Sequence, residues 1–77
     1  MDERGPCRME IAEHAIPLGA FLKYCAAVET GGEAKHLIQL GGVTVNGVVE
    51  IRRRHLLVNG DCVCLPDGRR YLVVSHR

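Results

Sequence analysis

Aromatic residues are scarce in this chain of 77 residues, which contains one Phe, two Tyr and no Trp. Proteins that bind single-stranded nucleic acids usually offer several aromatic rings on which the bases stack. Phe21 falls on an apolar helical stripe, which leaves Tyr24 and Tyr71 as the remaining candidates. The scarcity therefore argues against a protein that reads a single strand base by base.

Long apolar stretches are also lacking, because no run in the chain approaches the roughly 20 residues that a membrane-spanning helix requires. The first six residues, Met-Asp-Glu-Arg-Gly-Pro, are polar and do not contain the apolar segment of a secretory signal peptide. We therefore expect a cytoplasmic protein. The length suits one domain, which we expect at residues 9–77, after a flexible tail at residues 1–8.

No residue pattern typical of an enzyme is present. The chain has no phosphate-binding Gly-rich loop followed by Lys-Ser or Lys-Thr, no His-Glu-x-x-His and no pair of carboxylates on one face. Cys62 or Cys64 can be combined with His55 as nucleophile and base, but no third residue would orient the pair. We therefore predict a protein without catalytic activity and without a cofactor.

The four cysteines do not have the spacing of a typical metal site. Zinc sites usually contain repeated Cys-x2-Cys pairs or one such pair followed by a His pair, whereas this chain has a single Cys-x-Cys. Cys62 and Cys64 would share one face of a strand, but a metal ion would need two further ligands from elsewhere. Cys25 fits an apolar helical stripe, where a thiol acts as a small hydrophobic group. A metal or redox protein remains an alternative that metal analysis of the pure protein would test.

Positive charge is concentrated rather than abundant. The formal net charge is +1, yet residues 1–15 carry four acidic and two basic side chains, while residues 16–77 carry eight basic and five acidic ones. Arg52, Arg53 and Arg54 are adjacent in the second segment. Three adjacent like charges repel one another, and a bound polyanion would relieve that repulsion.

The conformation of this arginine run decides which side chains act together. In an extended segment successive side chains point to opposite faces. We therefore expect Arg52 and Arg54 to share a face and to bind phosphate together. Arg53 would then point elsewhere and pair with Glu50 or Asp61.

Two short amphipathic helices are predicted in the first half of the chain. The first covers about residues 17–28, because apolar residues recur at helical spacing along one stripe. The second covers about residues 31–40, because Thr30 and Glu33 have the spacing of a capping box. Gly41 is expected to end this helix in the left-handed conformation.

The remaining segments are typical of short strands. The alternation around Met9 suggests a strand at a sheet edge, and the Asn46-Gly47 pair predicts a two-residue hairpin turn within residues 43–49. Further strands are expected at residues 62–65 and 71–74. The pattern therefore predicts an α+β fold in which a helix-turn-helix precedes a β-hairpin and further short antiparallel strands.

Four segments in the same order resemble the S4 RNA-binding domain: Leu18-Gly-Ala-Phe-Leu-Lys23, Thr30-Gly-Gly-Glu-Ala-Lys35, Gly42-Val-Thr-Val-Asn-Gly47 and Val58-Asn-Gly-Asp61. The resemblance covers about residues 14–74 and is greatest to small stand-alone S4-like proteins of bacteria, which share an acidic-x-Arg-Arg stretch after the hairpin. It implies an S4-like fold and a bacterial, monomeric, ribosome-associated protein of translation. The implied function is non-catalytic binding of structured RNA, either rRNA or tRNA.

The resemblance also implies which residues face the RNA. In this family the RNA lies on the helix-turn-helix and the adjoining hairpin. The corresponding residues here are Lys35, Arg52, Arg53 and Arg54 as phosphate contacts, with Lys23, Gln39 and the main-chain amides of Gly31 and Gly32 as supporting contacts. Many S4 domains start the first helix with Arg-Leu-Asp and place Ser-Arg before the second, where this chain has Pro17-Leu18-Gly19 and Gly31-Gly32. Two customary basic positions are therefore missing, which shifts the expected surface toward the arginines and Lys35, a residue that we expect in the first turn of the second helix.

Alternatives of other classes remain. One is a protein-interaction adaptor that has an S4-like fold but no physiological RNA ligand. A β-grasp sulfur carrier would need a free Gly-Gly end, whereas this chain ends in Ser75-His76-Arg77. Charge alone does not separate RNA from DNA, because phosphate contacts carry no base information.

Overall fold

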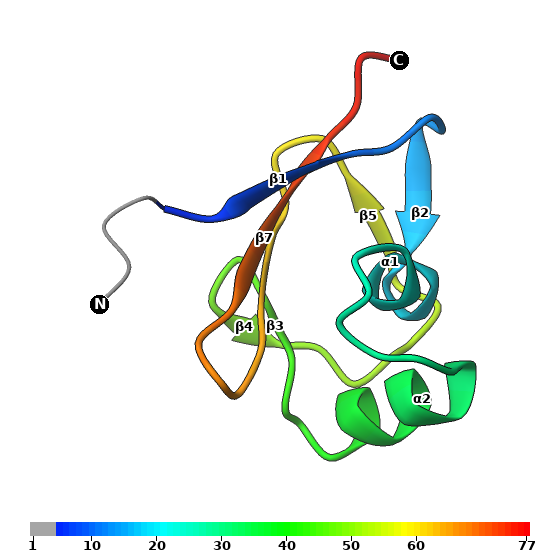
Figure 1. Ribbon diagram of the computed structural model, residues 1–77, viewed down its shortest axis with the longest axis vertical. Coiled ribbons are helices and arrows are strands. Elements are labelled where there is room, and N and C mark those ends of the chain that lie inside the picture. Colours follow the sequence, from blue (N-terminus) through cyan, green and yellow to red (C-terminus); the bar gives the residue numbers. More distant parts are fainter. Residues whose placement is uncertain (1–4) are drawn as a thin grey trace.

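A computed structural model describes residues 5–77, which form two helices and seven short strands (Figure 1). The α+β class predicted from the sequence is confirmed. The first four residues of the predicted flexible tail lie outside the described residues. In chain order the elements are β1 (Cys7–Glu10), β2 (Ala15–Pro17), α1 (Leu18–Tyr24), α2 (Gly31–Gln39), β3 (Thr44–Val45), β4 (Val48–Val49), β5 (Leu56–Val58), β6 (Cys62–Cys64) and β7 (Arg70–Val74).

Five of the strands form one sheet in the order β1-β7-β6-β3-β4. Its pairs are antiparallel except at the β1 edge, where Cys7 lies opposite Tyr71 in a parallel pair. The predicted edge strand at Met9 is present, but it begins at Cys7, so Cys7 and Arg8 belong to the sheet and not to a tail. Both of their side chains are exposed, and main-chain pairing with β7 leaves no hydropathy signal in the sequence.

The remaining two strands, β2 and β5, form a separate antiparallel pair with Ala15 opposite Val58. Strand β2 was not predicted, and it runs directly into α1, so that Pro17 is the N-cap of the helix and not part of its first turn. The helix is also shorter than the predicted range 17–28. It ends at Tyr24 because Ala26 adopts a left-handed conformation with φ of 57°, which is incompatible with a continuing right-handed helix.

The second helix and the hairpin follow the prediction closely. The Thr30 side chain accepts a hydrogen bond from the main-chain N–H of Glu33 at 3.1 Å, and the left-handed Gly41 ends α2 with φ of 80°. Asn46 and Gly47 have φ values of 52° and 84°, as a two-residue hairpin turn between β3 and β4 requires.

The core lies between the five-stranded sheet and the two helices, which sit together beside it (Figure 1). Phe21 of α1 is fully buried, and its ring meets that of Tyr71 edge-on with centroids 6.4 Å apart. Leu18 and Leu22 of α1 and Ile38 of α2 are also fully buried. The start of α1 is therefore fixed by packing.

Within residues 5–77, neither helix has the length and apolar character needed to cross a membrane.

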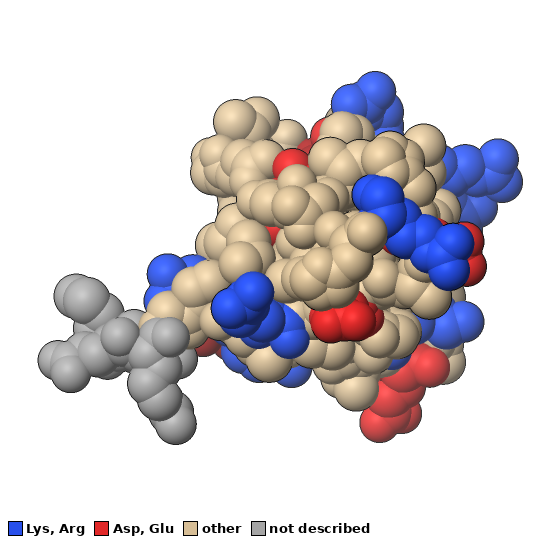
Figure 2. Space-filling view, turned by 90° about the horizontal axis from the view of Figure 1, so that it is seen from above, with Lys and Arg blue, Asp and Glu red and all other residues tan. Residues whose placement is uncertain are grey.

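Charged side chains are distributed unevenly over the surface. Figure 2 shows Lys and Arg side chains at one side of the molecule and others at the opposite side, with acidic side chains interspersed. The pairing of each cation with its acidic neighbours, and not the net charge of the chain, therefore decides which cations are available.

Candidate functional site

The three consecutive arginines lie in a turn and not in an extended segment. The main-chain N–H of His55 donates a hydrogen bond to the carbonyl of Arg52 at 3.1 Å, and this closes a four-residue turn, Arg52–His55, that we call the arginine turn. The predicted alternation of side chains along an extended segment is therefore wrong for these residues. In a turn, successive side chains do not alternate between two faces as they do along a strand.

The main chain of the arginine turn is attached to the start of α1. Pro17 offers no side-chain cap to this helix, and the first N–H groups of any helix lack acceptors within the helix. Here the N–H of Leu18 donates to the carbonyl of His55 at 2.8 Å, and that of Gly19 donates to the carbonyl of Arg53 at 2.9 Å. The arginine turn thus caps α1, and the same two hydrogen bonds attach this turn to the buried start of the helix.

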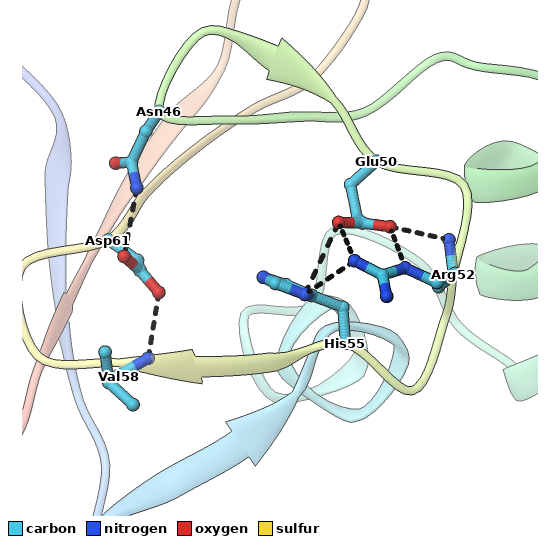
Figure 3. A network of polar contacts seen from close by, with 6 residues as sticks. All are labelled: Asn46, Glu50, Arg52, His55, Val58 and Asp61. Atoms are coloured by element: carbon cyan, nitrogen blue, oxygen red, sulfur yellow. Dashed lines mark hydrogen bonds and ion pairs between the residues drawn. The ribbon is translucent and has the colours of Figure 1, made fainter.

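The side chain of Arg52 is occupied by an acidic neighbour (Figure 3). Its Nε lies 2.9 Å from Oε2 of Glu50 and its Nη2 lies 3.2 Å from Oε1, while the main-chain N–H of Arg52 also donates to Oε2 at 3.0 Å. The Nδ1 atom of His55 lies 3.4 Å from Oε1 of the same carboxylate. The pKa of Glu50 falls to about 2, mainly because of the hydrogen bonds from the Arg52 side chain and next because of the hydrogen bond from its main chain. The prediction that Arg53 pairs with Glu50 or Asp61 is therefore wrong, because Arg52 is the partner of Glu50.

The side chains of Arg53 and Arg54 are available. Both are exposed, and within residues 5–77 neither forms an ion pair with an acidic side chain. Arginine without a carboxylate partner can bind phosphate through two parallel N–H groups. These two residues are therefore the strongest candidates for anion contacts in the arginine turn.

Arg53 and Arg54 border a shallow groove of about 330 Å³ at the N-terminal end of α2. Lys23, from the last turn of α1, lies on the same groove, which also contains Gly31, the first residue of α2. A helix start carries partial positive charge and attracts anions. This N-terminal groove, lined by Pro17, Gly19, Ala20, Lys23, Gly31, Ala34, Arg53 and Arg54, thus brings cations from two elements to one helix start.

The same two arginines border a second groove, of about 490 Å³, at the C-terminal end of α2. Gln39 is the last residue of that helix, and Ile51 precedes the arginine turn. We call this the C-terminal groove, lined by Gln39, Ile51, Arg52, Arg53, Arg54 and His55. The structure therefore brings Lys23, Gln39 and the arginines together around the two ends of α2.

Two of the predicted RNA-binding residues lie elsewhere. Lys35 and Gly32 are exposed on α2 but line neither of the two grooves. The first turn of α2 comprises residues 31–34. Lys35 lies one residue beyond this turn, so the prediction that it lies in the first turn is wrong. Both residues remain candidate contacts for a ligand that extends along the helix.

Sequence reasoning did not single out Gly19 or Ile51 as parts of the site. Gly19 borders the N-terminal groove, and a Cβ atom there would lie 3.4 Å from the carbonyl oxygen of Arg53. Ile51 and His55 border the C-terminal groove. The one signal in the sequence was the unusual position of an apolar Ile between an acidic residue and three arginines.

The hairpin before the arginine turn is fixed by a polar network (Figure 3). One carboxylate oxygen of Asp61 accepts the main-chain N–H of Val58 at 2.9 Å, and the other accepts the side-chain amide of Asn46 at 3.0 Å. The carbonyl oxygen of the Asn46 side chain accepts the main-chain N–H of Cys62 at 2.9 Å. The hairpin turn and the turn between β5 and β6 are thereby joined.

Other candidate groups lie away from the arginine turn. Cys62 and Cys64 share a strand face and are half-buried, and within the described part of the chain no three His, Cys, Asp or Glu side chains are grouped as metal ligands. The Nε atom of Arg69 lies 2.7 Å from a carboxylate oxygen of Asp67. Neither group extends the site around α2.

Comparison with protein families gives a match. The model of the S4 domain family matches residues 9–74, a range that contains both helices, the hairpin and the arginine turn. No curated protein sequence matches the chain. The predicted S4-like fold is thereby confirmed.

Proposed function

We propose that this chain, which belongs to the S4 domain family, binds structured RNA through its arginine turn and the start of α2. S4 domains are RNA-binding domains and are generally non-catalytic. The observation that carries the proposal is the exposed, unpaired state of Arg53 and Arg54 on a turn that the buried start of α1 holds in place. A preorganised pair of cations binds phosphate without first losing side-chain partners.

The N-terminal groove would hold the RNA backbone. A phosphate there meets Arg53, Arg54 and Lys23, while the amide at Gly31 adds the partial charge of the helix start. Lys35 lies on the same helix and would contact the next part of the backbone. Arg52 would contribute less, because Glu50 already neutralises its charge.

The ligand that fits this surface is RNA with base-paired structure. Phe21 and Tyr71 are buried, and the Tyr24 hydroxyl donates a hydrogen bond to the carbonyl of Glu10. No array of exposed rings is therefore available within residues 5–77 for successive stacked bases. Recognition of backbone shape in rRNA or tRNA is consistent with these contacts. We further propose that the protein is a monomer of the bacterial cytoplasm that associates with the ribosome or another part of translation.

Salt-dependent binding tests the proposal. We expect binding of a tRNA or an rRNA hairpin, followed by fluorescence anisotropy, to weaken with KCl along a slope of about −2 to −4 in log–log form, which corresponds to three to five phosphate contacts. Replacement of Lys23, Arg53 and Arg54 by Ala should remove most of the affinity and most of the slope. Arg69→Ala is the control for loss of a single positive charge, because it removes that charge from a residue paired with Asp67.

The result that would overturn the proposal is a triple variant with unchanged affinity and unchanged slope. Crosslinking in cells, followed by sequencing of the attached nucleic acid, would identify the physiological ligand. Recovery of rRNA or tRNA would support the link to translation, and recovery of DNA would exclude the preference for RNA.

A second candidate function is that of a protein-interaction adaptor with no physiological RNA ligand. The observation that favours it is a set of large apolar side chains that are more than half exposed at the end of α2 and on β4, namely Leu40, Val48 and Val49. An apolar interface is insensitive to salt, whereas phosphate contacts are not. A partner retained at high salt by the triple variant would support the adaptor.

A further inference from the structure

The C-terminal groove has a different chemistry from the N-terminal groove. Ile51 is 58% exposed although its side chain is large and apolar, and it lies on the groove beside Gln39. Within residues 5–77 the side-chain amide of Gln39 forms no hydrogen bond, so its NH₂ donor and its carbonyl acceptor are both unused. An apolar surface next to a free amide is not what a phosphate group requires.

The polarity of α2 separates the two grooves further. The N-terminal groove lies at Gly31, where the helix carries partial positive charge, and the C-terminal groove lies at Gln39, where the last carbonyls carry partial negative charge. The polarity of α2 therefore adds to the attraction of an anion in the N-terminal groove and weakens it in the C-terminal groove. A neutral, flat, polar-edged group suits the C-terminal end.

We propose that the C-terminal groove holds the base of one unpaired nucleotide in the bound RNA. This inference rests on the proposed RNA-binding function. Arg53 and Arg54 border both grooves, so a strand whose phosphates contact them in the N-terminal groove passes the entrance of the other. One extruded base at that position would enter the C-terminal groove.

The lining of the groove provides the contacts that a base needs. Ile51 offers apolar contact to the base face, the Gln39 amide offers a donor and an acceptor to the base edge, and a guanidinium of Arg54 can stack on the opposite face. The volume of about 490 Å³ lies within the range of small-molecule sites, roughly 300–1,000 Å³. The proposal therefore adds base recognition at a single position to binding that is otherwise based on backbone shape.

The Glu50 carboxylate fixes one wall of this groove. It holds the guanidinium of Arg52 at two points and lies 3.4 Å from Nδ1 of His55. Both of these residues line the groove. Their partners are supplied by the protein itself, so they shape the groove and leave Gln39, Ile51 and Arg54 to contact the base.

The test uses three RNA hairpins of identical stem sequence. One is fully paired, one carries a single bulged nucleotide, and one carries an abasic nucleotide at the bulge, which keeps the phosphate and the bend but lacks the base. Each of the four bases is tested in the bulge. We expect the wild-type protein to bind at least one base-containing bulge about tenfold more tightly than the abasic bulge, as the contact energy of one stacked base predicts.

Variants then locate the discrimination. Gln39→Ala and Ile51→Ala should each reduce the affinity for the preferred bulge toward that for the abasic RNA, and Ile51→Ala should leave the abasic affinity and its salt slope unchanged. Leu56→Ala is the matched control, because it truncates an equally exposed apolar side chain on β5 that does not line the groove.

The outcomes separate this inference from the proposed function. Equal binding of all base-containing and abasic bulges, or discrimination that survives both groove variants, overturns the base site and leaves RNA binding by the arginine turn intact. Absence of any salt-dependent binding to all three hairpins contradicts both. Loss of discrimination in the groove variants alone supports the base site.

Discussion

The carboxylate of Glu50 accepts two hydrogen bonds from the guanidinium of Arg52, with Nε–Oε2 at 2.9 Å and Nη2–Oε1 at 3.2 Å. The same carboxylate accepts the main-chain N–H of Arg52, so it shapes the start of the arginine turn as well as neutralising one of its charges. The three consecutive arginines are therefore not equivalent. One belongs to the scaffold, and Arg53 and Arg54 are left for a ligand.

The salt dependence of RNA binding should reveal this division. Each phosphate contact contributes about 0.7–0.9 to the log–log slope, so Arg53→Ala and Arg54→Ala should each lower the slope by about that amount. Arg52→Ala should leave the slope almost unchanged, because its charge is already paired with Glu50. Anisotropy titrations over a range of KCl concentrations measure the slope. An Arg52→Ala slope that falls as far as that of Arg54→Ala would contradict the division.

The ion pair should also contribute to stability in a pH-dependent way. The pKa of Glu50 falls from its ordinary value of 4.5 to about 2 in the folded protein because of its hydrogen bonds from Arg52. A carboxylate with a lowered pKa stabilises the folded state above its ordinary pKa, and this contribution is lost as the pH falls from about 4.5 to about 2. Wild type and Glu50→Gln should therefore differ in their free energy of unfolding at pH 7 and converge near pH 2.

Urea unfolding at several pH values measures this difference. Glu29→Gln is a suitable control, because Glu29 is exposed and forms no ion pair or hydrogen bond within residues 5–77. It should track the wild type at every pH. A gap between wild type and Glu50→Gln that is as large at pH 2 as at pH 7 would show that the carboxylate charge is not the source of the stabilisation.

The parts of the fold that were predicted correctly depend on short-range signals. The Thr30 cap, the Gly41 stop and the Asn46-Gly47 turn each depend on one to three neighbouring residues, and each is present in the structure. Strand β2 and the start of β1 were missed because their existence depends on partners far along the chain, β5 and β7. Strands of three or four residues are too short to carry a periodicity that the sequence would reveal.

The error about the arginines has the same origin. Strand alternation was assumed for Arg52, Arg53 and Arg54, but the turn is stabilised by the N–H groups of Leu18 and Gly19, more than thirty positions earlier in the sequence. No local pattern indicates that the start of α1 lacks a side-chain cap and takes its acceptors from this turn. The residue types in the site were therefore predicted, whereas their division into scaffold and ligand contacts required the structure.

The network around Asp61 should be important for stability. Its carboxylate accepts the N–H of Val58 and the side-chain amide of Asn46, and Asn46 in turn accepts the N–H of Cys62. Asp61→Ala leaves the N–H of Val58 and the side-chain amide of Asn46 without this acceptor, which should cost about 1–3 kcal/mol in the free energy of unfolding. Asp61→Asn keeps one acceptor oxygen and should cost less. Urea unfolding that finds the two variants equally destabilised would show that the accepted hydrogen bonds are not what the side chain contributes.

Gly42, three residues after the end of α2, should not tolerate a side chain. A Cβ atom there would lie 2.9 Å from Cδ1 of Leu37, 3.0 Å from Cγ of Pro66 and 3.2 Å from the main-chain oxygen of Leu37. The main-chain oxygen cannot move without disturbing the helix end, so Gly42→Ala should lower the free energy of unfolding by about 1–3 kcal/mol. Gly31→Ala is the matched control, because a Cβ atom at that helix start meets nothing within 4 Å. It should be neutral or stabilising by up to about 1 kcal/mol, and equal destabilisation of both variants in urea unfolding would refute the steric argument at Gly42.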